Sequence, residues 1–190
     1  MKLDPKDFSQ QVNDCRRRAE QLAANLTGQQ LLHRPDPTKW SVADCLTHLT
    51  VTGSLVQKIA RKNIAEARQN KVFGTGPFST GPRGRLLIWV AEPPPKFRIP
   101  APKGIIPPIT TDPDRVLPAF MQVQEGWESL LKDAEGLDLY KIKIGELLSP
   151  FRCRLSGGLL WMMAHQRRHL CQAENVKKRI VSDASRAAAV

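Results

Sequence analysis

Aromatic and acidic side chains are both scarce in this sequence of 190 residues. Aromatic residues make up 6% of the chain, and 29 Lys and Arg outnumber 18 Asp and Glu to give a net charge of +11. A surface that stacks nucleic-acid bases needs aromatic residues interleaved with basic ones, and the basic residues here are scattered along the chain. The charge therefore favours a solvated basic surface, and nucleic-acid binding is the less favoured alternative.

Closely paired cysteines and long apolar runs are also missing. The longest apolar runs, at 86–91 and 159–164, are too short to cross a bilayer, and residues 1–5 lack the apolar core of a signal peptide. The absence of a C-x-x-C pair disfavours a zinc ribbon or a disulfide framework. The four cysteines are Cys15, Cys45, Cys153 and Cys171. We expect a soluble cytoplasmic protein with reduced thiols and no membrane association, folded as one domain over residues 1–190.

Apolar residues recur every three or four positions in four segments, which is the spacing of one helix face. These predicted helices lie at about 4–32, 41–69, 111–136 and 156–181. A break in the first is indicated near Thr27 and Gly28. The second begins at Ser41 with a capping-box pattern, in which Asp44 replaces the usual Glu or Gln. The fourth is predicted to begin with a cap near Ser156.

Proline is concentrated between the second and third predicted helices. Eleven of the 15 prolines fall within residues 71–118. Proline removes a backbone donor and clashes with the preceding turn, so only 84–92 is predicted to form a short helix there. A connection of this length is typical of a crossover that also serves as a lid. The predicted fold is all-α: a four-helix bundle with a long Pro-rich crossover between helices 2 and 3, a loop or short extended piece at 137–154 and a frayed tail at 182–190.

Three of the four histidines lie on apolar helix faces. His48 lies on that face of the second helix, and His165 and His169 lie one turn apart in the middle of that of the fourth. Three neutral imidazoles that leave one position open are a ligand set for a catalytic zinc or a related divalent ion. For His48 alone, a hydrogen-bonded core histidine is an open alternative, but burying a pair of imidazoles without partners would cost several kcal/mol. His33, at the end of the first helix, is expected at the surface.

The residues around the histidine pair exclude two other kinds of metal site. Gln166 stands where H-E-x-x-H metalloproteases carry their catalytic glutamate, so peptide hydrolysis by that route is not supported. No cysteine pair at finger spacing precedes the histidines, which excludes a C2H2 zinc finger. No Asp or Glu is placed convincingly as a general base.

Several residues near the histidines are weaker candidates for the same site. Asp44, one turn before His48, could accept a hydrogen bond from an imidazole N–H, although a carboxylate at a helix start is the commoner role. Gln172 is a similar candidate beside the apolar face of the fourth helix. Cys45 shares the face of His48 and could be a metal ligand or a redox thiol, but a small buried core residue is the expected role. Three tryptophans are expected in the core or in the walls of a cavity: Trp40, Trp127 and Trp161.

Two segments resemble the DinB-like superfamily of metal-binding four-helix bundles. Residues 40–49 read W-S-x-x-D-x-L-x-H-L, and residues 165–172 read H-x-x-R-H-L-x-Q. The order of the predicted helices and the Pro-rich crossover are similar as well, so the resemblance covers nearly the whole chain. In that family the corresponding histidines bind a divalent metal, commonly zinc or nickel. The resemblance therefore assigns His48, His165 and His169 as metal ligands.

The resemblance implies an enzyme that uses the metal to activate a low-molecular-weight thiol or water, as an S-transferase or hydrolase acting on a small molecule. A metal held by three neutral histidines lowers the pKa of a bound thiol or water. A non-catalytic, metal-stabilised ligand-binding module is the alternative. Arg167 and Arg168, beside the histidine pair, are candidates to attract an anionic cosubstrate. Because relatives often dimerise, a homodimer is a further expectation.

Overall fold

The computed structural model describes residues 1–94, 112–144 and 153–187. The helices are α1 (Pro5–Ala23), α2 (Gly28–Leu32), α3 (Val42–Gln69), α4 (Gly81–Ala91), a 3₁₀ turn (Pro113–Arg115), α5 (Val116–Asp133) and α6 (Leu155–Ala187). Two antiparallel pairs of two-residue strands join β1 (Lys2–Leu3) to β2 (Phe78–Ser79) and β3 (Lys143–Ile144) to β4 (Cys153–Arg154). The all-α prediction is confirmed.

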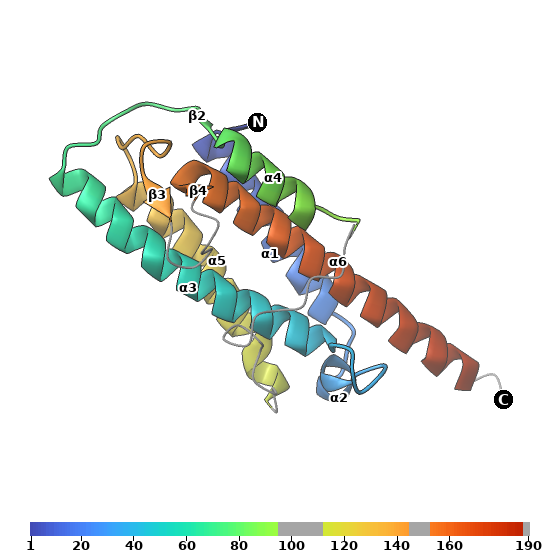
Figure 1. Cartoon of the computed structure of the whole chain (residues 1–190). Coiled ribbons are helices and arrows are strands. Elements are labelled where there is room, and N and C mark those ends of the chain that lie inside the picture. The colour runs from blue at the N-terminus through green and yellow to red at the C-terminus, as the bar shows by residue number, and fades with distance from the viewer. Residues whose placement is uncertain (95–111, 145–152, 188–190) are drawn as a thin grey trace.

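The bundle consists of the four long helices α1, α3, α5 and α6, and Figure 1 shows how they lie beside one another. Helices α1 and α3 each pack against both α5 and α6, which places α1 and α3 at opposite corners. Helices α1 and α6 run in one direction, and α3 and α5 run in the other. Side-chain contacts follow the parallel course of α1 and α6: Gln11 binds Arg167, and Arg18, two turns further on, binds Glu174.

The long crossover follows from the parallel course of α3 and α5. Near the middle of α3, Gln57 Nε2 donates to the backbone oxygen of Val123, and near its end Arg68 Nη2 donates to that of Asp133, each at 2.7 Å. Because α3 and α5 end side by side, the chain must return over the length of α5, which has 18 residues or about 27 Å, before α5 can begin. The predicted crossover is therefore needed by the topology. Residues 95–111, and with them much of the predicted lid, lie outside the described residues.

Within the described part of the crossover, one helix, α4, packs against α6. It was predicted at 84–92 and begins three residues earlier, at Gly81, with Pro82 in its first turn. The two helices approach closely at a pair of glycines. A Cβ atom on Gly84 would lie 2.9 Å from the Cα of Gly157, so a larger residue at position 84 would push α4 away from α6.

The helix boundaries confirm one prediction and correct two. The first predicted helix is broken where expected, because α2 begins at Gly28 behind a Thr27 cap. The predicted cap at Ser156 is wrong: α6 begins at Leu155 directly after β4, and the Ser156 hydroxyl donates to the backbone oxygen of Ser79 at 2.7 Å. The predicted end of the fourth helix at about residue 181 is also corrected, since α6 continues to Ala187 and no glycine or proline interrupts it there.

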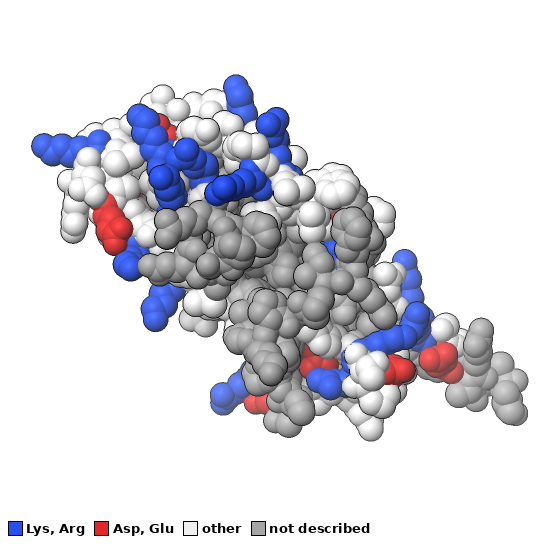
Figure 2. Space-filling view, viewed as in Figure 1, with Lys and Arg blue, Asp and Glu red and all other residues white. Residues whose placement is uncertain are grey.

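Charged side chains of the described residues are visible on the face shown in Figure 2. Basic side chains lie at both ends of the face shown in Figure 2, with acidic side chains among them. No helix of the described residues combines the length and the apolar composition needed to cross a bilayer.

Among the residues that the structure describes, two glutamines are buried in the bundle without hydrogen-bond partners. Gln124 of α5 is 0% exposed and Gln166 of α6 is 1% exposed. In the described structure, the amide oxygen and nitrogen of both side chains are unpaired. A buried polar group without a partner costs about 1–3 kcal/mol. These positions therefore reduce the stability of the bundle.

Replacing Gln124 with methionine, which has a similar shape and no amide, is expected to raise the free energy of unfolding by about 1 kcal/mol. Denaturant titration measures this change. Gln57→Met is the matched control, because the Gln57 amide donates to Val123 and its loss should lower stability or leave it unchanged. A Gln124→Met protein less stable than the parent would show that the amide has a partner.

Candidate metal centre

Three histidines from two helices meet between α3 and α6. His48 comes from α3, and His165 and His169 come from successive turns of α6. One nitrogen of each ring lies within 4.8 Å of the others, and His48 Nε2 is 3.1 Å from His165 Nε2. His48 is 1% exposed, whereas the two histidines of α6 are half-buried. The structure thus brings together the three histidines that the sequence singled out.

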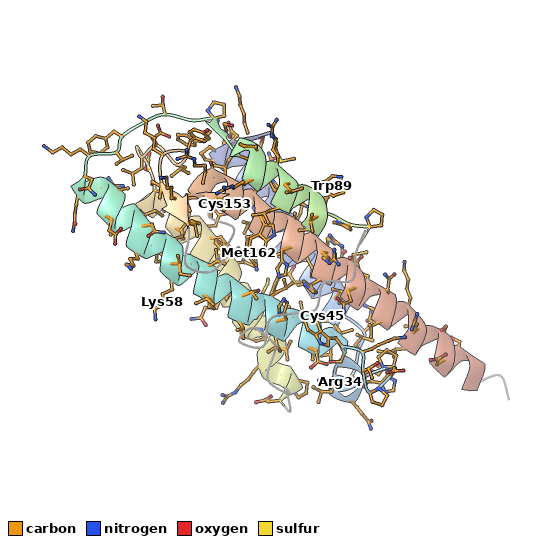
Figure 3. All side chains as sticks on the ribbon, in the orientation of Figure 1. Arg34, Cys45, Lys58, Trp89, Cys153 and Met162 are labelled. Carbon is orange, nitrogen blue, oxygen red and sulfur yellow. The ribbon has the colours of Figure 1, made fainter. Side chains whose placement is uncertain are left out.

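Polar contacts at the start of α3 determine where His48 lies. Ser41 Oγ accepts from the backbone N–H of Asp44 at 3.0 Å, and Asp44 Oδ2 accepts from that of Ser41 at 2.8 Å. Arg34, labelled in Figure 3 near this end of α3, donates to both oxygens of the Asp44 carboxylate at 2.8 and 2.9 Å. Asp44 therefore has the helix-start role that the capping pattern predicts.

A glutamine one turn along α6 sets the orientation of His169. His169 Nδ1 lies 3.1 Å from Gln172 Oε1. A carbonyl oxygen can only accept, so Nδ1 carries the proton and Nε2 keeps its lone pair. This is the kind of contact that orients histidine ligands in metal sites.

Burial and nearby positive charge keep the two α6 imidazoles neutral. Burial lowers the pKa of His165 well below its ordinary value, and the charges of His169, His48 and Arg168 lower it further. The pKa of His169 falls to about 3, mainly through burial and then through His48, although the hydrogen bond with Gln172 opposes the change. Neutral imidazole is the form of histidine that binds metal ions.

The donor set fits a divalent transition ion such as zinc or nickel. Within the described ranges, the cluster consists of three imidazoles and includes no carboxylate or thiolate. Burial raises the pKa of the Cys45 thiol far above its ordinary value, so this residue stays neutral and belongs to the core, as expected. Three imidazole ligands suit such ions and leave a coordination position for water or substrate.

The two arginines beside the histidine pair have different partners. Arg167 binds both carboxylate oxygens of Glu92 at 2.8 Å and the side-chain oxygen of Gln11 at 2.7 Å. Arg168 donates to the backbone oxygen of Val90 at 3.2 Å, and its charge contributes to the lowered pKa of both α6 histidines. The charge of Arg167 is therefore paired with a carboxylate, and the charge of Arg168 is close enough to the cluster to lower the pKa of its α6 histidines.

The tryptophans differ in their relation to the cluster. Trp127 is fully buried in the core, whereas Trp40 and Trp161 lie against imidazoles of the cluster. The spacing of four residues between Trp161 and His165 is the sequence signal for one of these contacts. Trp40 contacts histidines on two helices, which no local spacing indicates. His33 is exposed at the end of α2, as predicted.

Residues 11–173, which include all three histidines, match the sequence pattern of the DinB superfamily. The chain belongs to the DinB superfamily. Among solved structures, its fold is similar to that of YfiT from Bacillus subtilis, described as "a probable metal-dependent hydrolase with an unusual four-helix bundle topology". The TM-score is 0.61 at 15% sequence identity, over 92% of this chain and 86% of YfiT. No curated protein matches the chain.

Replacing Gln172 with leucine is expected to weaken metal binding by about 10- to 100-fold, the effect typical of removing a residue that orients a histidine ligand. Titration with zinc against a chromophoric chelator measures the change. Gln172→Glu keeps an acceptor for His169 Nδ1 and should bind zinc at least as tightly as the parent. The exposed Asn175, three residues further along α6, provides a neutral control as Asn175→Ala. Equal affinities for Gln172→Leu and the parent would remove Gln172 from the site.

Proposed function

We propose that this DinB protein is a divalent-metal-dependent enzyme that activates a low-molecular-weight thiol or water at the three-histidine cluster and acts on a small-molecule substrate. The observation that carries the proposal is the convergence of three imidazoles between α3 and α6, with no carboxylate from the described ranges beside them. Zinc or nickel is the proposed ion. When bound, such an ion lowers the pKa of a thiol or water and supplies a nucleophile at neutral pH.

The residues of the chain hold and orient this site. His48, His165 and His169 would hold the ion, and Gln172 keeps the proton of His169 on Nδ1. In the described part of the chain, no Asp or Glu joins the cluster as a general base. A thiol, with an ordinary pKa of about 8.5, needs less help to ionise than water does. We therefore favour S-transfer to a small electrophile over hydrolysis.

The comparisons support metal dependence in general terms. The DinB assignment and the description of YfiT as a probable metal-dependent hydrolase agree with a catalytic ion. All four cysteines are free, which is compatible with a reducing cytoplasm where a thiol cosubstrate would stay reduced. A homodimer without nucleic-acid or membrane partners stays a prediction.

Replacing Arg168 with glutamine is expected to raise KM for an anionic thiol about fivefold, equivalent to about 1 kcal/mol for one screened charge. The metal content should not change. Steady-state kinetics with a carboxylate-bearing thiol and with cysteamine, which is cationic, measures the selectivity. Arg167→Gln is the matched control, because Glu92 already pairs with that charge. An unchanged KM in Arg168→Gln would exclude a role of this charge in thiol recognition.

The proposed activity is tested by incubating zinc- or nickel-loaded protein with a panel of thiols and 1-chloro-2,4-dinitrobenzene as a general electrophile. A p-nitrophenyl ester in parallel assays tests for hydrolysis. We expect turnover that requires the metal and is lost in His165→Ala. Metal-loaded protein that turns over none of these substrates would instead support a metal-stabilised ligand-binding module.

A further inference from the structure

Two tryptophan rings stack on two of the three imidazoles. The ring centroids of Trp40 and His169 are 5.4 Å apart with an interplanar angle of 27°, and those of Trp161 and His165 have the same separation and angle. Trp40 also lies 4.8 Å from His48 in a tilted arrangement. Each histidine of the cluster therefore has an indole ring beside it.

The helices themselves determine where these tryptophans lie. Trp161 precedes His165 by four residues on α6, so the two side chains lie one above the other on the same helix face. Trp40 immediately precedes Ser41, whose capping box fixes the start of α3. From there it reaches across to His169 on α6. One contact is thus local, and the other joins two helices.

The two α6 histidines differ in what else orients them. His169 has a hydrogen bond from Nδ1 to Gln172. In the described structure, His165 Nε2 shares a hydrogen bond with His48 Nε2. That hydrogen bond needs a proton on one of the two nitrogens, so it is lost when both nitrogens give their lone pairs to an ion. The terminal torsion of a histidine side chain is broad, so another group must define the plane of the His165 ring. Trp161 is the neighbour placed to do so.

We infer that Trp161 and Trp40 are positioning residues, which hold the imidazoles of His165 and His169 in the planes that metal binding requires. The inference rests on the proposed metal site. Stacking restricts rotation of each ring, so less freedom is lost when the ion binds. The electron-rich face of indole also favours a partner ring that carries positive charge, as an imidazole does when it gives its lone pair to a cation. Trp161 is expected to have the larger effect.

The stacking itself is tested in metal-free protein by NMR. Protons held over an indole face resonate upfield of their usual positions. We expect Trp161→Leu to return the carbon-bound ring protons of His165 towards usual values while those of His169 change little, and Trp40→Leu to do the reverse. Trp161→Phe should retain part of the upfield shift. Ring protons of His165 that do not move in Trp161→Leu would overturn the inference.

The effect on metal binding is tested with cobalt(II), whose visible spectrum reports ligand geometry. Trp161→Leu is expected to bind cobalt about tenfold more weakly than the parent, because it loses one favourable ring contact. The visible absorption bands of the bound cobalt should change as well. Trp161→Phe should restore most of the affinity. Trp89→Leu is the matched control, since Trp89 is 52% exposed on α4 and is marked in Figure 3.

Two results would overturn the proposal in different ways. If the parent protein binds cobalt and Trp161→Leu protein binds it with equal affinity and an identical spectrum, the positioning role alone is overturned. Parent protein that binds no cobalt overturns the proposed metal function and the positioning role with it. Unfolding curves for each variant show that weaker cobalt binding does not reflect loss of the fold.

Discussion

Replacing His165 with alanine is expected to abolish stoichiometric binding of a divalent ion. His165 supplies one of three ligand nitrogens and lies 3.1 Å from that of His48. Because removal of a residue that only orients a ligand costs about 10- to 100-fold in affinity, loss of the ligand itself should cost more than about 100-fold. Metal analysis of protein purified without chelator and chelator-competition titration both measure the change. His169→Ala should behave in the same way.

The fourth histidine provides the control for this experiment. His33 is exposed at the end of α2 and is not one of the clustered histidines, so His33→Ala should keep the metal content and affinity of the parent. A denaturant unfolding curve of His165→Ala checks that the fold survives the substitution. His165→Ala protein that retains one tightly bound ion per chain would be evidence against the three-histidine centre.

Replacing Arg34 with methionine is expected to lower the free energy of unfolding by about 3 kcal/mol, the lower end of the range for breaking a buried ion pair. Arg34 donates two hydrogen bonds to Asp44, and the Asp44 side chain is 3% exposed. Without the guanidinium, the carboxylate would stay buried with the bond from Ser41 alone. The partial exposure of Arg34 keeps the expected loss below the top of that range. Urea denaturation measures it.

A second arginine–aspartate pair serves as the control. Arg17 and Asp14 are 2.6 Å apart, but both side chains are more than half exposed, so Arg17→Met should change stability by no more than about 1 kcal/mol. Asp44→Asn in the Arg34→Met background should recover part of the loss, because it removes the unpaired charge. If Arg34→Met and Arg17→Met have equal effects, Asp44 is hydrated and the pair does not anchor α3.

This ion pair also connects the fold with the site. His48 lies one turn after Asp44 on α3, so a loosened helix start would displace one ligand of the cluster. Zinc affinity measured in Arg34→Met should therefore fall together with stability. The ligand from α3 depends on an anchor in the loop before the helix, whereas the two ligands from α6 lie in the middle of a continuous 33-residue helix.

Helical spacing was enough to predict most of the fold. The capping pattern at Ser41 placed the start of α3 correctly. The concentration of prolines identified the crossover, and apolar periodicity identified the four long helices. Local signals failed at Ser156, because a serine near a helix start can form its hydrogen bond with a distant part of the chain once the protein is folded. Here its hydroxyl donates to the backbone oxygen of Ser79, which lies in another segment.

The candidate site was partly predictable from sequence. Spacing puts His165 and His169 on one face of a helix, and the Trp161 stack follows from the same rule. Spacing does not distinguish Arg167 from Arg168, which are neighbours in sequence but lie about 100° apart around α6. Only the packing of α4 and α1 against α6 gives Arg167 a carboxylate partner in Glu92 and an amide partner in Gln11.

By itself, the sequence determined the helices, the crossover and the three histidines able to bind a metal, because each depends on contacts within a few turns of one helix or on the chemistry of one side chain. The tertiary structure decided which groups meet, namely His48 with the α6 pair and Trp40 with His169. It also decided that Gln124 and Gln166 are buried with no hydrogen-bond partner among the described residues. These outcomes depend on how helices distant in sequence align along the bundle axis. The spacing of residues within one helix cannot predict how that helix aligns with the others.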